Sequence, residues 1–176
     1  IVILSSYNAL EDFKSIAAPE HQGRGTVLQF VSQPSNMLVS KNIVLEELEK
    51  KYGFKGAYFF LPNQFWEHKN HIRLLEAIHI LAAEKNLIVN VVLVGSAKNA
   101  DDQIMEYIQI KNLSSQVFML SYVSNEELVA LYKIAVALIM PSLLGPTNIP
   151  QLEAFALKCP VLTSSVYGVP DQVGDA

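Results

Sequence analysis

The sequence has little of several features that mark particular classes of protein. Its 176 residues include one cysteine, Cys159, which excludes a disulfide framework and favours a reducing compartment. The net charge is −4 without a basic block, which argues against nucleic acid as a partner, because phosphates are met by a positive stripe. No apolar run approaches the ~20 residues that span a bilayer. No Gly-x-Gly-x-x-Gly follows an apolar run, which disfavours a dinucleotide-binding dehydrogenase.

Both ends of the chain also lack the marks of a natural terminus. There is no signal peptide, Ile1 begins directly in an apolar run, and the chain stops at Gly174, Asp175 and Ala176. We therefore expect a fragment of a longer protein. Hydrophobic residues make up 51% of the chain, which excludes disorder and suffices for a domain with its own core.

The sequence does contain a regular alternation of short apolar runs and amphipathic stretches. Continuous apolar runs predict strands at 1–4, 27–31, 58–61, 89–94, 117–120, 136–140 and 159–163. Helical spacing predicts helices at 8–15, 42–52, 72–85, 101–111, 126–133 and 151–157. The alternation predicts an α/β fold, a Rossmann-like parallel sheet with helices on both faces. A turn-rich break at 32–36 predicts a boundary, so that residues 1–33 and 34–176 belong to different domains.

Three polar loops follow predicted strands, at residues 63–71, 95–100 and 144–150. The carboxyl ends of parallel strands meet at one sheet edge, and ligands bind there where the strand order reverses. Pro150 stands where a helix begins, and the free N–H groups and dipole of a helix start favour an anion. Glu153 is close to this helix start, and its carboxylate can accept two hydrogen bonds from a diol such as a ribose.

Residues 141–154 read Pro-Ser-Leu-Leu-Gly-Pro-Thr-Asn-Ile-Pro-Gln-Leu-Glu-Ala. This stretch resembles the donor-site signature of the retaining glycosyltransferases of family four, which have the GT-B fold, in a branch with a Gly-Pro-Thr-Asn-Ile-Pro loop. The resemblance runs from about residue 5 to the end, where the sequence reads Gly-Val-Pro-Asp-Gln-Val-Gly-Asp-Ala. It implies that residues 34–176 are a carboxy-terminal nucleotide-sugar-binding domain, incomplete at its end, and that residues 1–33 end the domain before it.

The activity implied by this resemblance is transfer of a hexose, with mannose as one candidate, from a nucleotide diphosphate sugar. The acceptor would be a hydroxyl of a saccharide or lipid-linked saccharide in polysaccharide biosynthesis, and the configuration would be retained. No cofactor and no metal ion are implied. The location implied is cytoplasmic, with peripheral attachment to the inner face of the cell membrane as one option. The fragment alone is expected to bind nucleotide weakly without turnover.

In this family, an arginine and a lysine after the first strand of the domain clamp the donor diphosphate. Lys69 falls on the lysine, just before a helix start that would otherwise disfavour a cation, and a bound diphosphate would remove that conflict. Gln64 falls on the arginine and carries no charge, so Lys69 and backbone amides, or another cation, must hold the diphosphate. Arg73 is a candidate helper, although a helix-surface charge is the simpler interpretation.

The family also has two glutamates with seven residues between them in the central loop. Glu153 is the second and is assigned to the ribose hydroxyls, whereas Gly145 stands at the first, so one contact to the transferred sugar is lost. The amides of Thr147, Asn148 and Ile149 correspond to those that meet sugar and phosphate, and the Thr147 and Asn148 side chains could add hydrogen bonds to the sugar. Asn148 is expected to occupy the left-handed region that a family glycine occupies.

Further candidates have weaker support. Tyr122 and Val123 resemble a family segment whose backbone lines the nucleotide base, although packing explains Tyr122 equally well. Lys158 replaces a glycine at a helix end, which predicts a non-glycine residue with positive φ. His68 and His71 share an i, i+3 spacing but lack further ligands at metal-site spacing, so we expect no metal site.

Two other functions stay open at this stage. Sugar-nucleotide epimerases share the fold and act on the sugar without an acceptor. A non-catalytic nucleotide-binding or interaction domain is the other alternative, made plausible by the departures at Gly145 and Gln64.

Overall fold

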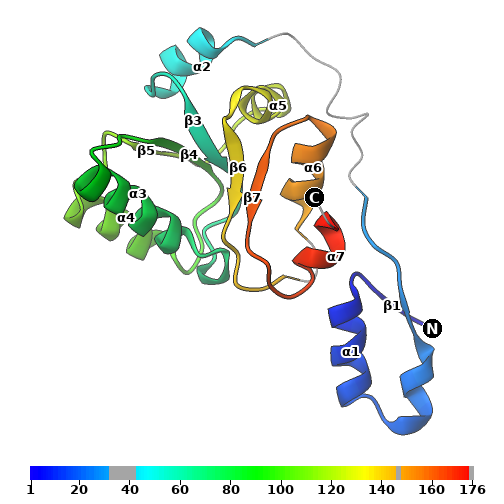
Figure 1. Cartoon of the computed structure of the whole chain (residues 1–176). Helices are drawn as coiled ribbons and strands as arrows, with labels where there is room; N and C mark the ends of the chain where they lie inside the picture. The colour runs from blue at the N-terminus through cyan, green and yellow to red at the C-terminus, as the bar shows by residue number, and fades with distance from the viewer. Residues whose placement is uncertain (32–42, 146–147, 175–176) are drawn as a thin grey trace.

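The computed structural model describes residues 1–31, 43–145 and 148–174 (Figure 1). The first of these ranges forms a small unit of two parallel strands, with a helix and a 3₁₀ turn between them. In order these elements are β1 (Val2–Leu4), α1 (Tyr7–Ile16), η1 (Pro19–Arg24) and β2 (Gly25–Val27). The predicted boundary after residue 33 lies outside the described residues.

The strand predicted at 27–31 is wrong, because the paired segment is Gly25–Val27. The physical reason is the length of its partner. β1 ends at Leu4, and Ser6 then caps α1 by accepting a hydrogen bond from the N–H of Ala9. After the Leu28 N–H donates to the Leu4 carbonyl, β1 offers no further backbone for a ladder.

The rest of the described chain builds one sheet of five parallel strands, which confirms the predicted fold class. The strands are β3 (Tyr58–Leu61), β4 (Asn90–Val94), β5 (Val117–Leu120), β6 (Ala137–Met140) and β7 (Val161–Thr163). The other elements are α2 (Leu45–Tyr52), η3 (Glu67–Lys69), α3 (His71–Lys85), α4 (Asp101–Ile110), α5 (Asn125–Ile134), α6 (Ile149–Ala156) and α7 (Val169–Val173). The strand order is β5-β4-β3-β6-β7, so the order reverses between β3 and β6.

Each face of this sheet buries its own apolar cluster. On one face Leu75 of α3 lies with Leu93 of β4 and with residues of α4, and Figure 1 shows α3 and α4 side by side. On the other face Phe60 of β3 packs edge-on against Tyr132 of α5, with ring centroids 5.0 Å apart. Alternate strand residues supply the two clusters, which is the expected result for a sheet covered on both sides.

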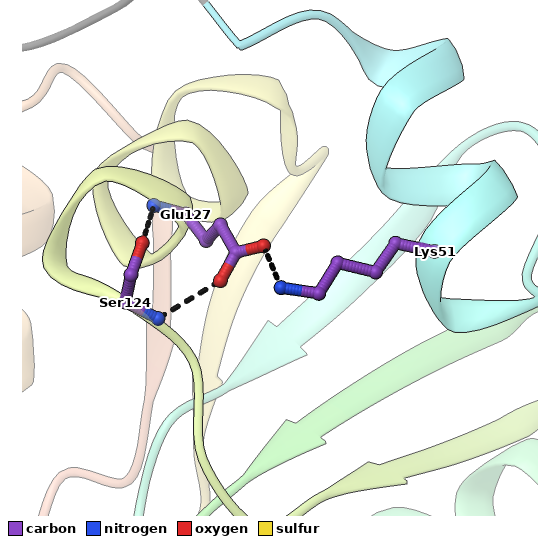
Figure 2. A network of polar contacts seen from close by, with 3 residues as sticks. All are labelled: Lys51, Ser124 and Glu127. Carbon is purple, nitrogen blue, oxygen red and sulfur yellow. Dashed lines mark hydrogen bonds and ion pairs between the residues drawn. The ribbon is translucent and has the colours of Figure 1, made fainter.

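A polar network outside the sheet fixes the start of α5 and joins it to α2 (Figure 2). Ser124 Oγ accepts from the N–H of Glu127 at 3.2 Å, and Glu127 Oε2 accepts from the N–H of Ser124 at 2.9 Å. This reciprocal capping box satisfies two N–H groups that the helix leaves unpaired. The other carboxylate oxygen of Glu127 forms an ion pair with Lys51 of α2.

The short helix α7 links the two-stranded unit to the larger sheet. The Asp171 carboxylate accepts from the N–H of Tyr7, in the first turn of α1, at 3.0 Å. The Asp171 carbonyl accepts from the Gln29 side chain at 3.0 Å. Among the described residues, no helix is both long and apolar enough to cross a bilayer.

Candidate functional site

Two loops meet where the strand order reverses, one after β3 and one after β6. The side chain of Asn70 donates to the Pro141 carbonyl at 3.0 Å, and the N–H of Leu143 donates to the His68 carbonyl at 2.8 Å. These bonds join the two loops above the sheet edge. Such a switch point is the usual ligand-binding position of an open parallel sheet.

Lys69 stands at the end of η3 and reaches across the junction. The next residue, Asn70, takes a left-handed conformation (φ 60°) from which α3 begins. Lys69 Nζ donates to Asn148 Oδ1 at 3.0 Å. Burial lowers the pKa of Lys69. No carboxylate of the described residues forms an ion pair with this ammonium, so its charge is held by a neutral amide.

Asn148 is buried and precedes α6 as its N-cap. Its φ is −116°, so the predicted left-handed conformation is wrong. An N-cap residue needs extended backbone to let its carbonyl accept the first bond of the helix, here from the N–H of Gln151 at 3.3 Å. Among the described residues of this loop, Gly145 has a positive φ of 149°. The N–H of Asn148 donates to the Gln172 side chain at 2.9 Å.

Glu153 lies in the second turn of α6 and is half-buried. Its Oε2 accepts from the Tyr132 hydroxyl at 2.7 Å. Burial, together with the Glu153 carboxylate, raises the pKa of Tyr132 well above its ordinary value, so the phenol stays protonated and acts as a donor. The contact therefore fixes one carboxylate oxygen of Glu153 from the core side.

The other predicted site residues make no hydrogen bond to Lys69 or to the Asn148 side chain among the described residues. Gln64 is exposed, and its side chain accepts from the Trp66 indole at 2.9 Å. Ile149 is half-exposed at the start of α6. Tyr122 and Val123 follow β5, the edge strand two places from β3. The Tyr122 side chain is exposed and that of Val123 is in the core.

The structure thus brings Lys69, Gly145 and Asn148 to the switch point, with Gly145 and Asn148 buried. It does not bring the Tyr122 segment there. Thr147 lies outside the described residues. The binding roles assigned to all these residues stay predictions.

Sequence reasoning missed several polar groups beside these loops. The Gln151 side chain is fully buried and donates to the Thr163 hydroxyl, and the Ser142 hydroxyl is buried as well. Within the described ranges, Gln151 Oε1 and Ser142 Oγ have no hydrogen-bond partner. Ser142 also lines a cavity of about 380 Å³ between this loop and α3. A serine two residues after a predicted strand was a visible signal, whereas nothing in the sequence pointed to Tyr132 as a partner of Glu153.

Two histidines that invited a metal interpretation have other surroundings. His71 opens α3 and packs edge-on against Phe65, with ring centroids 5.2 Å apart. Burial lowers the pKa of His71 to about 4, against a smaller opposing effect of the Asn63 backbone. The His68 ring stacks against the Trp66 ring, with ring centroids 6.4 Å apart. The described part of the chain contains no cluster of three or more His, Cys, Asp or Glu side chains suited to a metal ion.

Comparison with known proteins gives a consistent result. Residues 45–176 match the family model of the glycosyl transferases group 1. The chain is 24% identical to the O-antigen chain mannosyltransferase B of Escherichia coli over 185 residues, which cover 98% of this chain and 49% of that protein. It is 28% identical over 128 residues to the O-antigen chain mannosyltransferase RfbU of Salmonella typhimurium, covering 73% of this chain and 34% of that protein.

Among solved structures, the chain is similar to WaaG, a glycosyltransferase involved in lipopolysaccharide biosynthesis. The TM-score is 0.76 at 22% identity, over 98% of this chain and 46% of that one. The fold is therefore that of GT-B glycosyltransferases. The chain spans about half the length or less of the curated relatives it matches. Because the family model covers most of the sequence, the chain belongs to the glycosyl transferases group 1 family.

Proposed function

We propose that residues 34–176 bind the donor of a hexosyltransferase, a nucleotide diphosphate sugar, and that the sugar is transferred to an acceptor hydroxyl with retention. Membership of the family supports the reaction class. The names of two relatives, both O-antigen chain mannosyltransferases, support mannose as the sugar and a saccharide or lipid-linked saccharide as the acceptor.

One contact carries this proposal, the hydrogen bond of 3.0 Å between Lys69 Nζ and Asn148 Oδ1. It puts an ammonium group, free of any carboxylate partner among the described residues, beside the start of α6. The first N–H groups and the dipole of that helix favour an anion at the same place. Together they would stabilise the negative charge that develops on a diphosphate leaving group as the bond to the sugar breaks.

Glu153 supplies the second part of the proposed site. Its Oε2 is held by the Tyr132 hydroxyl, and among the described residues no hydrogen-bond partner of Oε1 is found. A carboxylate oriented in this way can accept hydrogen bonds from the ribose hydroxyls of the donor. We assign the backbone of residues 147–149 to sugar and phosphate contacts, and the backbone at Tyr122 and Val123 to the base.

The proposed reaction needs neither a cofactor nor a metal ion, because Lys69 and the helix amides offset the charge. Groups that bind the acceptor would come from the part of the protein outside these residues, so we expect the 176 residues alone to bind donor without turnover. We propose that the complete protein works on the cytoplasmic side of the cell membrane, in polysaccharide biosynthesis.

Calorimetric titration with a panel of nucleoside diphosphates tests the site. Lys69→Ala and Glu153→Ala should each weaken binding about 10- to 100-fold, the usual loss for a charge-assisted hydrogen bond. Lys133→Ala is the matched control, since Lys133 is exposed at the end of α5, and it should bind like the parent. If both site variants bind like the parent, the assignment is wrong.

A second measurement separates the reaction from its alternatives. The complete protein is incubated with labelled nucleotide sugars, GDP-mannose among them, and a saccharide acceptor. Transfer supports the proposal. An epimerised nucleotide sugar would identify an epimerase, and no product from any donor would favour the non-catalytic domain that the departures at Gly145 and Gln64 suggest.

A further inference from the structure

Gly145 and Asn148, two residues of the central loop, fit each other sterically. Gly145 is buried, with φ at 149°. A Cβ added at Gly145 would lie 3.2 Å from Asn148 Oδ1 and 3.5 Å from Asn148 Nδ2. The first distance is tighter than most side chains accept, and the backbone conformation disfavours any residue with a Cβ. Gly145 therefore leaves the space that the Asn148 amide occupies.

The two ends of the Asn148 amide are used differently. Oδ1 accepts from Lys69 Nζ, whereas Nδ2 is buried with no hydrogen-bond partner in the described ranges. The residue as a whole is 1% exposed. A buried donor without an acceptor destabilises a protein, so such a group indicates that an acceptor is supplied from elsewhere.

The chemistry of the amide also preserves the charge of Lys69. A carboxylate at this distance would pair strongly with the ammonium, because opposite charges attract each other more in a partly buried site than in water. A bound anion would have to compete with that pairing. An amide oxygen orients the ammonium without cancelling its charge, which leaves the cation available to an anionic ligand.

We propose that Asn148 is a positioning residue that holds the Lys69 ammonium toward the donor diphosphate and donates Nδ2–H to the same ligand, in a space that only glycine at position 145 provides. This proposal rests on the proposed function, because it takes the ligand to be a diphosphate. It adds a role for two residues at which the loop departs from the resembled signature.

The test compares Asn148→Asp, Asn148→Ala and Gly145→Ala with the parent, using inorganic pyrophosphate and nucleoside diphosphates as probes. Asn148→Asp should weaken binding at least 10-fold, because the new carboxylate pairs with Lys69. Asn148→Ala and Gly145→Ala should weaken it about 5- to 20-fold, because the ammonium loses its support. Asn112→Asp adds the same charge at an exposed position after α4 and should change nothing. Thermal melting checks that each variant folds.

A second readout does not depend on a ligand. NMR titration of the Lys69 ammonium should show a higher pKa in Asn148→Asp than in the parent, because the new carboxylate favours the charged form, whereas an Asn148 side chain that does not contact Lys69 would leave it unchanged. An unchanged Lys69 titration, or Asn148→Asp binding like the parent, overturns the inference. A parent that binds no probe overturns the proposed function and the ligand contact of Nδ2, and the titration still decides whether Asn148 holds Lys69.

Discussion

The two faces of the sheet and the crevice where the loops after β3 and β6 meet both contain buried side chains, but with different chemistry. The faces are filled by side chains such as Leu75, Leu93 and Phe60, all fully buried and apolar. Beside the crevice, Ser142 and Asn148 are equally inaccessible, yet each has a polar atom without a hydrogen-bond partner among the described residues.

This difference distinguishes side chains that stabilise the fold from side chains that are expected to bind a ligand. Apolar burial stabilises the fold by about 1.5–3 kcal/mol for each large side chain, whereas a buried unpaired polar group costs a comparable amount. Polar groups that are buried at the crevice without a partner are therefore expected to serve a ligand rather than the fold. Three sets of variants test this difference between the core and the crevice.

The largest effect is expected in the core. Leu75→Ala should lower the free energy of unfolding by about 2–5 kcal/mol, because it removes a fully buried side chain and leaves a cavity. Ile80→Ala, on the same helix but with a half-exposed side chain, should cost less than about 1 kcal/mol. Urea denaturation of both variants measures the difference. Equal losses at the two positions would contradict the assignment of the core.

A smaller effect, dependent on pH, is expected from His71. Its pKa is about 4 in the folded protein against 6.5 in the unfolded chain, so between these values the unfolded state binds more protons. The contribution of neutral His71 to the free energy of unfolding is therefore fully present above pH 6.5. It is lost as the pH falls toward 4, and the total loss is about 3 kcal/mol. His71→Phe keeps a ring against Phe65 and should flatten this part of the curve.

Stability of the parent and of His71→Phe, measured by denaturant unfolding at several values between pH 4 and 7.5, gives the difference directly. A loss of stability on acidification that is the same in both proteins would assign it to other groups.

The smallest effect is expected from two buried serines. Ser142→Ala removes a hydroxyl without a partner in the described part of the chain, so its free energy of unfolding should stay within about 0.5 kcal/mol of the parent or rise. Ser6→Ala removes an equally buried hydroxyl that caps α1, and should cost about 1 kcal/mol. Thermal unfolding compares the two. A larger loss at Ser142 would mean that its hydroxyl is paired after all.

The sequence predicted the parts of the molecule that are encoded locally. Apolar runs located the five strands of the sheet, and Gly53 marked the end of α2 with φ at 81°. The predicted positive φ of Lys158 is confirmed at 59°. These features depend on neighbours within a few residues, so composition and spacing are enough to find them.

The crevice could not be predicted to the same extent. The Lys69–Asn148 hydrogen bond joins residues 79 positions apart, and the Tyr132–Glu153 bond joins residues 21 apart. Such contacts are fixed by the order of the strands, which no local pattern specifies. The error at Asn148 has the same origin, because its backbone follows the helix it caps rather than the preference of asparagine for left-handed turns.

The helix α7 contacts two distant parts of the molecule, the amino-terminal unit and the loop before α6. Asp171 accepts from the first turn of α1, and its neighbour Gln172 accepts from the backbone of Asn148. Because both residues belong to a helix of five residues, a displacement of the amino-terminal unit that kept the Tyr7 bond intact would pull on the loop that steadies Lys69. Two adjacent side chains, those of Asp171 and Gln172, therefore connect the amino-terminal unit to the loop that contains Asn148.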